Sequence, residues 1–220
     1  MSEAFLEAIK KGDLVGVRDM LARDPALKDA RTAEGVHAAV LALYYGKEDV
    51  AKAILVHRPT LDLHAAASVG DLARVRELVG IDPAGVASYS PDGFPALGLA
   101  AYMGHRSVVE YLLSKGADVN QEGRNPEKFT ALTGAVATGQ RDVVEVLLKS
   151  GADPNYWYGG GFTPVLEAAA NGDIGILELL LAHGGDVMAK TGQGKTAVSL
   201  ALEKGHPEAA EFLRNRGAPG

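Results

Sequence analysis

Pairs of apolar residues recur along the chain at the spacing of one helix face. Residues 176–181 contain Ile176, Leu177, Leu180 and Leu181, while Glu178 falls on the opposite side. Apolar positions three and four residues apart are typical of a helix that buries a single stripe. The same stripe returns at Val108, Val109, Leu112 and Leu113, and again at Val143, Val144, Leu147 and Leu148. The pattern predicts a series of similar amphipathic helices.

A second, shorter helix is predicted before each of these, with its clearest copy in residues 163–172. The Thr163 hydroxyl can cap its N-terminus, and Pro164 suits the first helical position because its missing N–H costs nothing there. Ala168 and Ala169 keep the helix thin, so that an adjacent unit can approach closely. Gly172 can end it in a left-handed conformation. Turn-forming residues after the second helix predict a β-hairpin-like finger between successive helix pairs.

The glycine that ends the shorter helix returns at a nearly fixed interval. Five of the six intervals are 33–35 residues and one is 24, with the glycines at Gly12, Gly46, Gly70, Gly104, Gly139, Gly172 and Gly205. A period near 33 indicates a solenoid, in which each unit buries its apolar face against its neighbours. We therefore predict one continuous domain, residues 1–220.

These residues resemble the ankyrin repeat, whose hallmark is Thr-Pro-Leu-His, two small residues, Gly-His, paired Val, paired Leu and Gly-Ala-Asp-Val-Asn. The matching segments are residues 104–105, 116–120, 163–164 and 205–206. The resemblance covers essentially the whole chain and is closest to small bacterial ankyrin-repeat proteins. It implies an all-α solenoid of about seven helix-turn-helix repeats, with the first and last as caps. The approximate repeats are residues 1–34, 35–60, 61–92, 93–127, 128–160, 161–193 and 194–220.

The 24-residue interval departs from the family pattern. Between Leu55 and His64 there is room for little more than residues 57–62, which is too few for a finger. We predict a tight turn there, with one finger missing between repeats two and three. Residues 13–46 also align with residues 71–104, which indicates that a two-repeat unit was duplicated.

Composition and charge limit the possible partners and locations. The chain is 47% apolar and 23% charged, as in ordinary soluble proteins, and no apolar run is long enough for a membrane helix. A net charge of −6 argues against a nucleic-acid partner, because phosphate binding relies on clustered Lys and Arg. The N-terminal residues do not resemble a secretory signal. We expect a cytoplasmic monomer that binds neither nucleic acid nor membranes.

The candidate chemistry is sparse. There is no cysteine, and no two of the six histidines are four residues apart on a helix, as zinc ligands commonly are. His37 takes the place of Thr163 and can act as a helix cap. Carboxylates recur on successive outer helices, but stacked helices lie about 10 Å apart, too far for one metal ion to bridge. We expect no metal, no cofactor and no catalysis.

Aromatic residues are the remaining functional signal. The resemblance places most of them on the concave side, and exposed aromatics commonly anchor protein interfaces. The predicted partner-binding strip is Tyr44, Tyr45, Tyr102, Met103, Phe129, Tyr156, Trp157, Tyr158, Phe162 and Asn171. The alternative is that Phe94, Phe129 and Phe162, which are at equivalent positions, only pack neighbouring fingers together.

The sequence therefore favours a protein–protein interaction module that binds a partner protein through its concave groove. Two alternatives stay open. One is a small-ligand binder or enzyme that uses a notch at the missing finger, near Tyr44, Tyr45, His64 and Ser68. The other is a structural or self-associating spacer.

Overall fold

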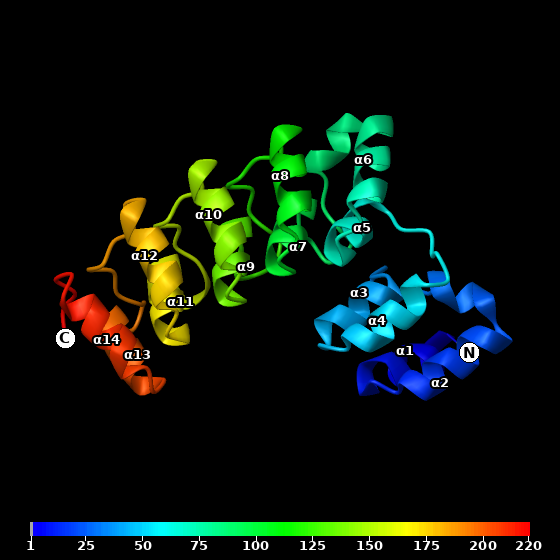
Figure 1. Ribbon diagram of the computed structural model, residues 1–220, viewed down its shortest axis with the longest axis horizontal. Helices are drawn as coiled ribbons and strands as arrows, with labels where there is room; N and C mark the ends of the chain where they lie inside the picture. The colour runs from blue at the N-terminus through cyan, green and yellow to red at the C-terminus, as the bar shows by residue number, and fades with distance from the viewer. Residues whose placement is uncertain (1) are drawn as a thin grey trace.

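Fourteen α-helices, paired in chain order, make up the computed structural model, which describes residues 2–220 (Figure 1). The inner helices are α1 (Ser2–Lys11), α3 (Ala38–Tyr44), α5 (Leu63–Val69), α7 (Ala96–Tyr102), α9 (Ala131–Ala137), α11 (Pro164–Asn171) and α13 (Ala197–Glu203). The outer helices are α2 (Leu14–Arg23), α4 (Glu48–Leu55), α6 (Leu72–Ile81), α8 (Arg106–Ser114), α10 (Arg141–Lys149), α12 (Ile174–Ala182) and α14 (Pro207–Arg214). Three short 3-10 helices are η1 (Pro25–Asp29), η2 (Pro83–Ala87) and η3 (Gly159–Gly161). The prediction of an all-α helical solenoid is confirmed.

Side-chain caps begin the inner helices α3 and α11, and a glycine with a positive φ ends α11. Thr163 Oγ1 accepts a hydrogen bond from the Leu166 N–H at 3.4 Å, and Gly172 ends α11 with a φ of 71°. At α3 the cap is His37, whose Nδ1 accepts from the Ala39 N–H at 3.1 Å. Both predicted caps are confirmed, and each satisfies a backbone donor that the helix itself leaves unpaired.

Fingers connect successive helix pairs. Single antiparallel β-bridges close four of them, at Arg31–His37, Tyr89–Pro95, Tyr158–Phe162 and Lys190–Thr196. Within residues 2–220 these bridges do not extend into strands. The connection from α4 to α5 is only residues 56–62, whereas that from α8 to α9 is residues 115–130.

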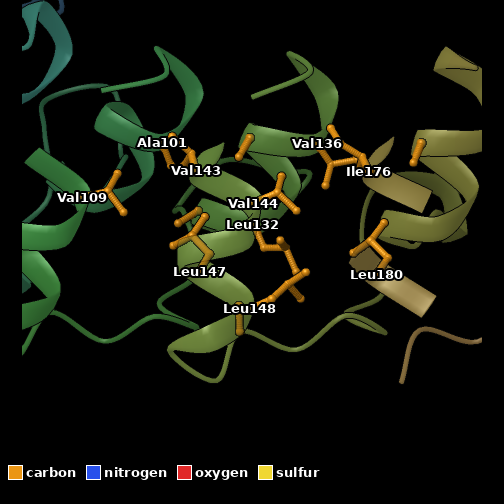
Figure 2. Packing of buried hydrophobic residues seen from close by; sticks show 14 of the residues in the cluster. Ala101, Val109, Leu132, Val136, Val143, Val144, Leu147, Leu148, Ile176 and Leu180 are labelled. Atoms are coloured by element: carbon orange, nitrogen blue, oxygen red, sulfur yellow. The ribbon is translucent and has the colours of Figure 1, made fainter. Parts of the chain in front are cut away.

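The predicted apolar stripes form the core between layers of helices. Val143, Val144, Leu147 and Leu148 of α10 are all at most 4% exposed. They pack among inner-helix residues of α9 and the stripes of α8 and α12, as Figure 2 shows around Leu132, Val109 and Leu180. Each repeat thus buries its apolar residues against the next, as expected of a solenoid.

The core is divided into two clusters of buried residues. One comprises residues of α1 to α4 and η1, and the other runs from α5 to the C-terminus. Val40 of α3 belongs to the second cluster and so joins the two. Inner helices α3 and α5 pack together, but the outer helices α4 and α6 make no comparable contact. In Figure 1 the axes of α1–α4 are inclined to those of the later pairs, so the solenoid changes direction at this junction.

The fingers on either side of the junction close up. A methyl group added at Gly35 would lie 3.1 Å from the ring of Pro91, so residues 31–37 contact residues 89–95 directly. The sequence predicts a notch here, but the space left is only about 20 Å³. Because α5 has no finger of its own on its N-terminal side, the flanking fingers meet across it and fill the expected notch.

Candidate functional site

An apolar pocket of about 310 Å³ opens between inner helices α7 and α9. Leu99 and Tyr102 of α7 and Ala137 of α9 line it, together with finger residues Phe94 and Phe129. Its remaining wall is Tyr44, which comes from α3, two inner helices earlier in the stack. We call this the inner-helix pocket.

The inner-helix pocket exists because two helical positions lack side chains. Gly98 of α7 and Gly134 of α9 both line it, whereas the equivalent positions in α11 are Leu166 and Glu167. A methyl group at Gly98 would have only Pro95 Cδ nearby, at 3.7 Å. Neither glycine needs a positive φ. Glycine inside a helix costs about 0.5–1 kcal/mol relative to alanine, so the pocket is maintained at some expense in helix stability.

Tyr44 reaches the pocket across α5. The equivalent position on α5 is the small residue Ser68, which leaves the path open. The Tyr44 hydroxyl donates a hydrogen bond to Asp92 Oδ2 at 2.8 Å, and Asp92 Oδ1 accepts from Ser90 Oγ at 2.6 Å. Burial, together with the neighbouring Asp92 carboxylate, raises the pKa of Tyr44 far above its usual value. The phenol therefore stays neutral and the negative charge stays on Asp92.

A second tyrosine–carboxylate pair adjoins Phe129, a residue of the pocket lining. Phe129 packs edge to face on Tyr158, with ring centroids 5.4 Å apart. The Tyr158 hydroxyl donates to Glu167 Oε2 at 3.3 Å, and burial again raises the pKa of the phenol. Tyr156 lies nearly parallel to Tyr158, with centroids 6.5 Å apart. Aromatic rings thus continue from the pocket wall along the fingers.

The structure brings together part of the predicted strip. Tyr44, Tyr102 and Phe129 line one pocket. Tyr45 and Trp157 do not line it and are 50% and 66% exposed. Tyr158 is only 6% exposed, so its ring supports Phe129 from behind instead of forming surface itself.

The other three residues of the strip have separate surroundings. Asn171 is exposed, and its side-chain amide donates to the Ala137 carbonyl oxygen at 3.4 Å. Met103 is half-buried at the end of α7. Phe162 is half-buried and packs against the main core cluster, which agrees with the alternative that it holds a finger in place.

Sequence reasoning missed the residues that create the pocket. The predicted strip consists mostly of large side chains, so it lacks Gly98 and Gly134, which line the pocket, and Asp92, which holds the wall residue Tyr44. A signal was present, since glycine replaces larger residues at two inner-helix positions in consecutive repeats. The reach of Tyr44 over α5 depends on the closed junction, which no local pattern encodes.

The polar groups at the junction mostly satisfy one another. Arg31 forms an ion pair with Asp62 at 2.8 Å, and His64 Nε2 lies 3.2 Å from the Ser88 carbonyl oxygen. His37 is 1% exposed, and its Nε2 has no hydrogen-bond partner. A space of about 20 Å³ holds about one water molecule, so this site is too small for a substrate.

The part of the chain that the structure describes has neither a candidate metal-ligand cluster nor a candidate membrane-spanning helix. Among residues 2–220, no cluster of three or more His, Asp or Glu side chains is placed to share a metal ion. No helix in the same range is long and apolar enough to cross a lipid bilayer.

Comparison with known proteins identifies the repeats. A family model described as "Ankyrin repeats (3 copies)" matches residues 63–156, and one described as "Ankyrin repeats (many copies)" matches residues 147–201. Together they span α7, α9 and every lining residue of the inner-helix pocket except Tyr44. A search of curated proteins finds no match.

Proposed function

Because this chain belongs to the ankyrin-repeat family, we propose that it binds a partner protein through the concave groove formed by its inner helices and fingers. Ankyrin repeats are generally protein–protein interaction modules and are typically non-catalytic. The proposal places the chain's own activity in recognition alone, carried out by a monomer.

The observation that supports this function is the inner-helix pocket beside exposed aromatic side chains. Tyr102 is 45% exposed at its edge, and Trp157 is 66% exposed farther along the fingers. Large rings of this kind dominate the energetics of many interfaces, because they bury much area at low entropic cost. Their positions are fixed by packed repeats, so little ordering is needed on binding.

The proposed contact residues are those of the predicted strip, in two roles. Tyr44, Tyr102 and Phe129 form the pocket, and Tyr45, Met103, Tyr156, Trp157 and Asn171 form its surroundings. Tyr158 and Phe162 act indirectly, because each supports a finger from below. This division follows from the burial of Tyr158 and the core contacts of Phe162.

The test first isolates a partner by affinity purification with the intact protein as bait. The dissociation constant of that partner is then measured with the wild type and with each variant. Tyr102→Ala and Trp157→Ala are each expected to weaken binding about tenfold or more, as truncation of an interface anchor does. Ile81→Ala is the control, because Ile81 is an apolar residue that is 75% exposed, more than Tyr102 or Trp157, and lies at the end of an outer helix. Unchanged affinity in both aromatic variants would show that the groove is not the binding surface.

A further inference from the structure

We propose that the inner-helix pocket binds an apolar side chain of the partner protein that is flanked by lysine or arginine residues. This inference rests on the proposed function and adds the chemistry of the partner segment. It follows from the shape of the pocket and from the two carboxylates that are linked to its lining.

The pocket suits a single large apolar side chain. Its lining is composed of aromatic rings, Pro95, Leu99, Ala137, two glycines and one polar residue, Thr130, and its volume is about 310 Å³. Binding to an exposed apolar cavity of this kind is favourable when a ring or a branched aliphatic chain displaces water from it. The half-buried rings of Phe94 and Phe129 present edges and faces to such an occupant.

Two carboxylates are linked to the pocket lining through tyrosine side chains. Asp92 accepts from the hydroxyl of Tyr44, a pocket wall, and Glu167 accepts from Tyr158, which packs on the wall residue Phe129. Both carboxylates are partly exposed, and neither forms an ion pair within residues 2–220. Each is hydrogen-bonded to a neutral phenol, which leaves its negative charge uncompensated.

Arg124 and Lys128, on the finger that precedes α9, contact residues that do not line the pocket. The Arg124 guanidinium stacks on the Tyr89 ring at 3.9 Å, and Lys128 pairs with Glu122 at 3.5 Å. Helices α7 and α9 contain no charged residue. The pocket is therefore an apolar surface with two carboxylates linked to its lining, neither of them in an ion pair among the described residues, and the net charge of the chain is −6. Complementary charges favour a cationic flank on either side of an apolar anchor.

The experiment displays a random peptide library against the intact protein and sequences the bound peptides. We expect enrichment of Phe, Trp or Leu with Lys or Arg within a few positions on both sides. Peptides with this pattern are then synthesised, and their affinities are measured at low and high salt. Affinity is expected to fall about threefold or more with added salt, because screening weakens attraction between exposed charges.

Three sets of variants separate the parts of the proposal. Gly98→Leu fills the pocket from a helical position with room for a side chain and is expected to weaken binding about tenfold or more. Gly134→Ala is the milder alternative if the leucine variant does not fold. Asp92→Asn with Glu167→Gln is expected to remove the preference for basic flanks and the salt dependence, while the apolar preference remains.

The outcomes distinguish this inference from the proposed function. Enriched peptides without basic flanks, or peptides that bind the Gly98→Leu protein normally but lose affinity with Trp157→Ala, would overturn the inference and leave groove binding intact. Peptides that are indifferent to Gly98→Leu, Tyr102→Ala and Trp157→Ala alike would overturn both.

Discussion

At the scale of single residues, His37 combines a structural role with a titratable group. Its ring is 1% exposed and its Nδ1 caps α3. Burial lowers the pKa of His37, and nearby Arg31 lowers it further, while Asp29 and Asp62 oppose the shift without reversing it. Protonation would also place a proton on the nitrogen that accepts the cap hydrogen bond. The neutral ring is therefore the form that suits the folded protein.

A pH dependence of stability follows from His37. Its folded pKa lies below the unfolded value of about 6.5, so the unfolded chain binds the proton more readily. This contribution is fully present above pH 6.5 and is lost as the pH falls toward the folded pKa. We expect His37→Thr, which copies the cap of α9, α11 and α13, to unfold with a weaker pH dependence below about pH 6.5 than the wild type.

Urea unfolding of both proteins at several pH values measures this difference. The comparison depends on the slope of stability against pH and not on absolute stability, because threonine fills less space than histidine. Equal slopes in the two proteins would contradict the assignment.

The two kinds of glycine predict substitutions of opposite sign. Gly98 is helical and has room for a methyl group, so Gly98→Ala is expected to stabilise the protein by about 0.5–1 kcal/mol. Gly172 has a φ of 71°, and an added methyl group would lie 2.5 Å from the His206 ring. Gly172→Ala is therefore expected to destabilise by about 1 kcal/mol or more.

Denaturation midpoints of the two alanine variants, measured together, check this pair. Destabilisation by Gly98→Ala would mean that no open space lies above that position.

At the scale of elements, the buried stripe of each outer helix makes the largest contribution. Leu147 of α10 is 0% exposed and packs in the main core cluster. Leu147→Ala is expected to destabilise the protein by about 2–5 kcal/mol, because it removes buried methyl groups and leaves a cavity. Leu202→Ala is the control, since Leu202 is 45% exposed and its truncation should change stability little. Thermal or urea unfolding gives both values, and a near-neutral Leu147→Ala would contradict the register of α10.

The sequence predicts elements well and the pocket poorly, for a physical reason. Helices such as α10 and α11 follow from stripes, caps and glycines that act within one repeat, and these local signals agree with one another. The pocket depends on what is missing at Gly98 and Gly134, and on Tyr44 arriving from another repeat. Such features arise only when neighbouring units are stacked. The space at the predicted notch is small for the same reason, because a tight connection brings the flanking fingers together.

At the scale of the whole molecule, the two core clusters divide the solenoid into unequal parts. Helices α1–α4 have their own buried residues, including Phe5 and Ile9. Their links to the rest include the α3–α5 contact, the contact of Gly35 with Pro91, the Arg31–Asp62 ion pair and the Tyr44–Asp92 hydrogen bond. In a repeat array stability is the sum of units and interfaces, so a weak interface allows one part to open before the other.

Hydrogen exchange can detect this division. We expect Ile9→Ala to speed amide exchange throughout residues 2–55 and to leave exchange in α9–α12 nearly unchanged. A loss of more than about 1.4 kcal/mol in the free energy of unfolding of the N-terminal part would speed exchange there about tenfold or more. Mass spectrometry of proteolytic peptides resolves the two regions. A uniform increase along the chain would show that the solenoid unfolds as one cooperative unit.

The reach of Tyr44 has a thermodynamic consequence. One wall of the pocket comes from α3, a helix of the first core, and the other lining residues come from α7, α9 and their fingers, which belong to the part of the chain that forms the second core. Any occupant that binds only when Tyr44 is in place must stabilise both cores at once. A partner bound in the pocket would then bridge the weakest interface of the stack. The cooperativity with which the two parts unfold would be set by the complex and not by the free chain.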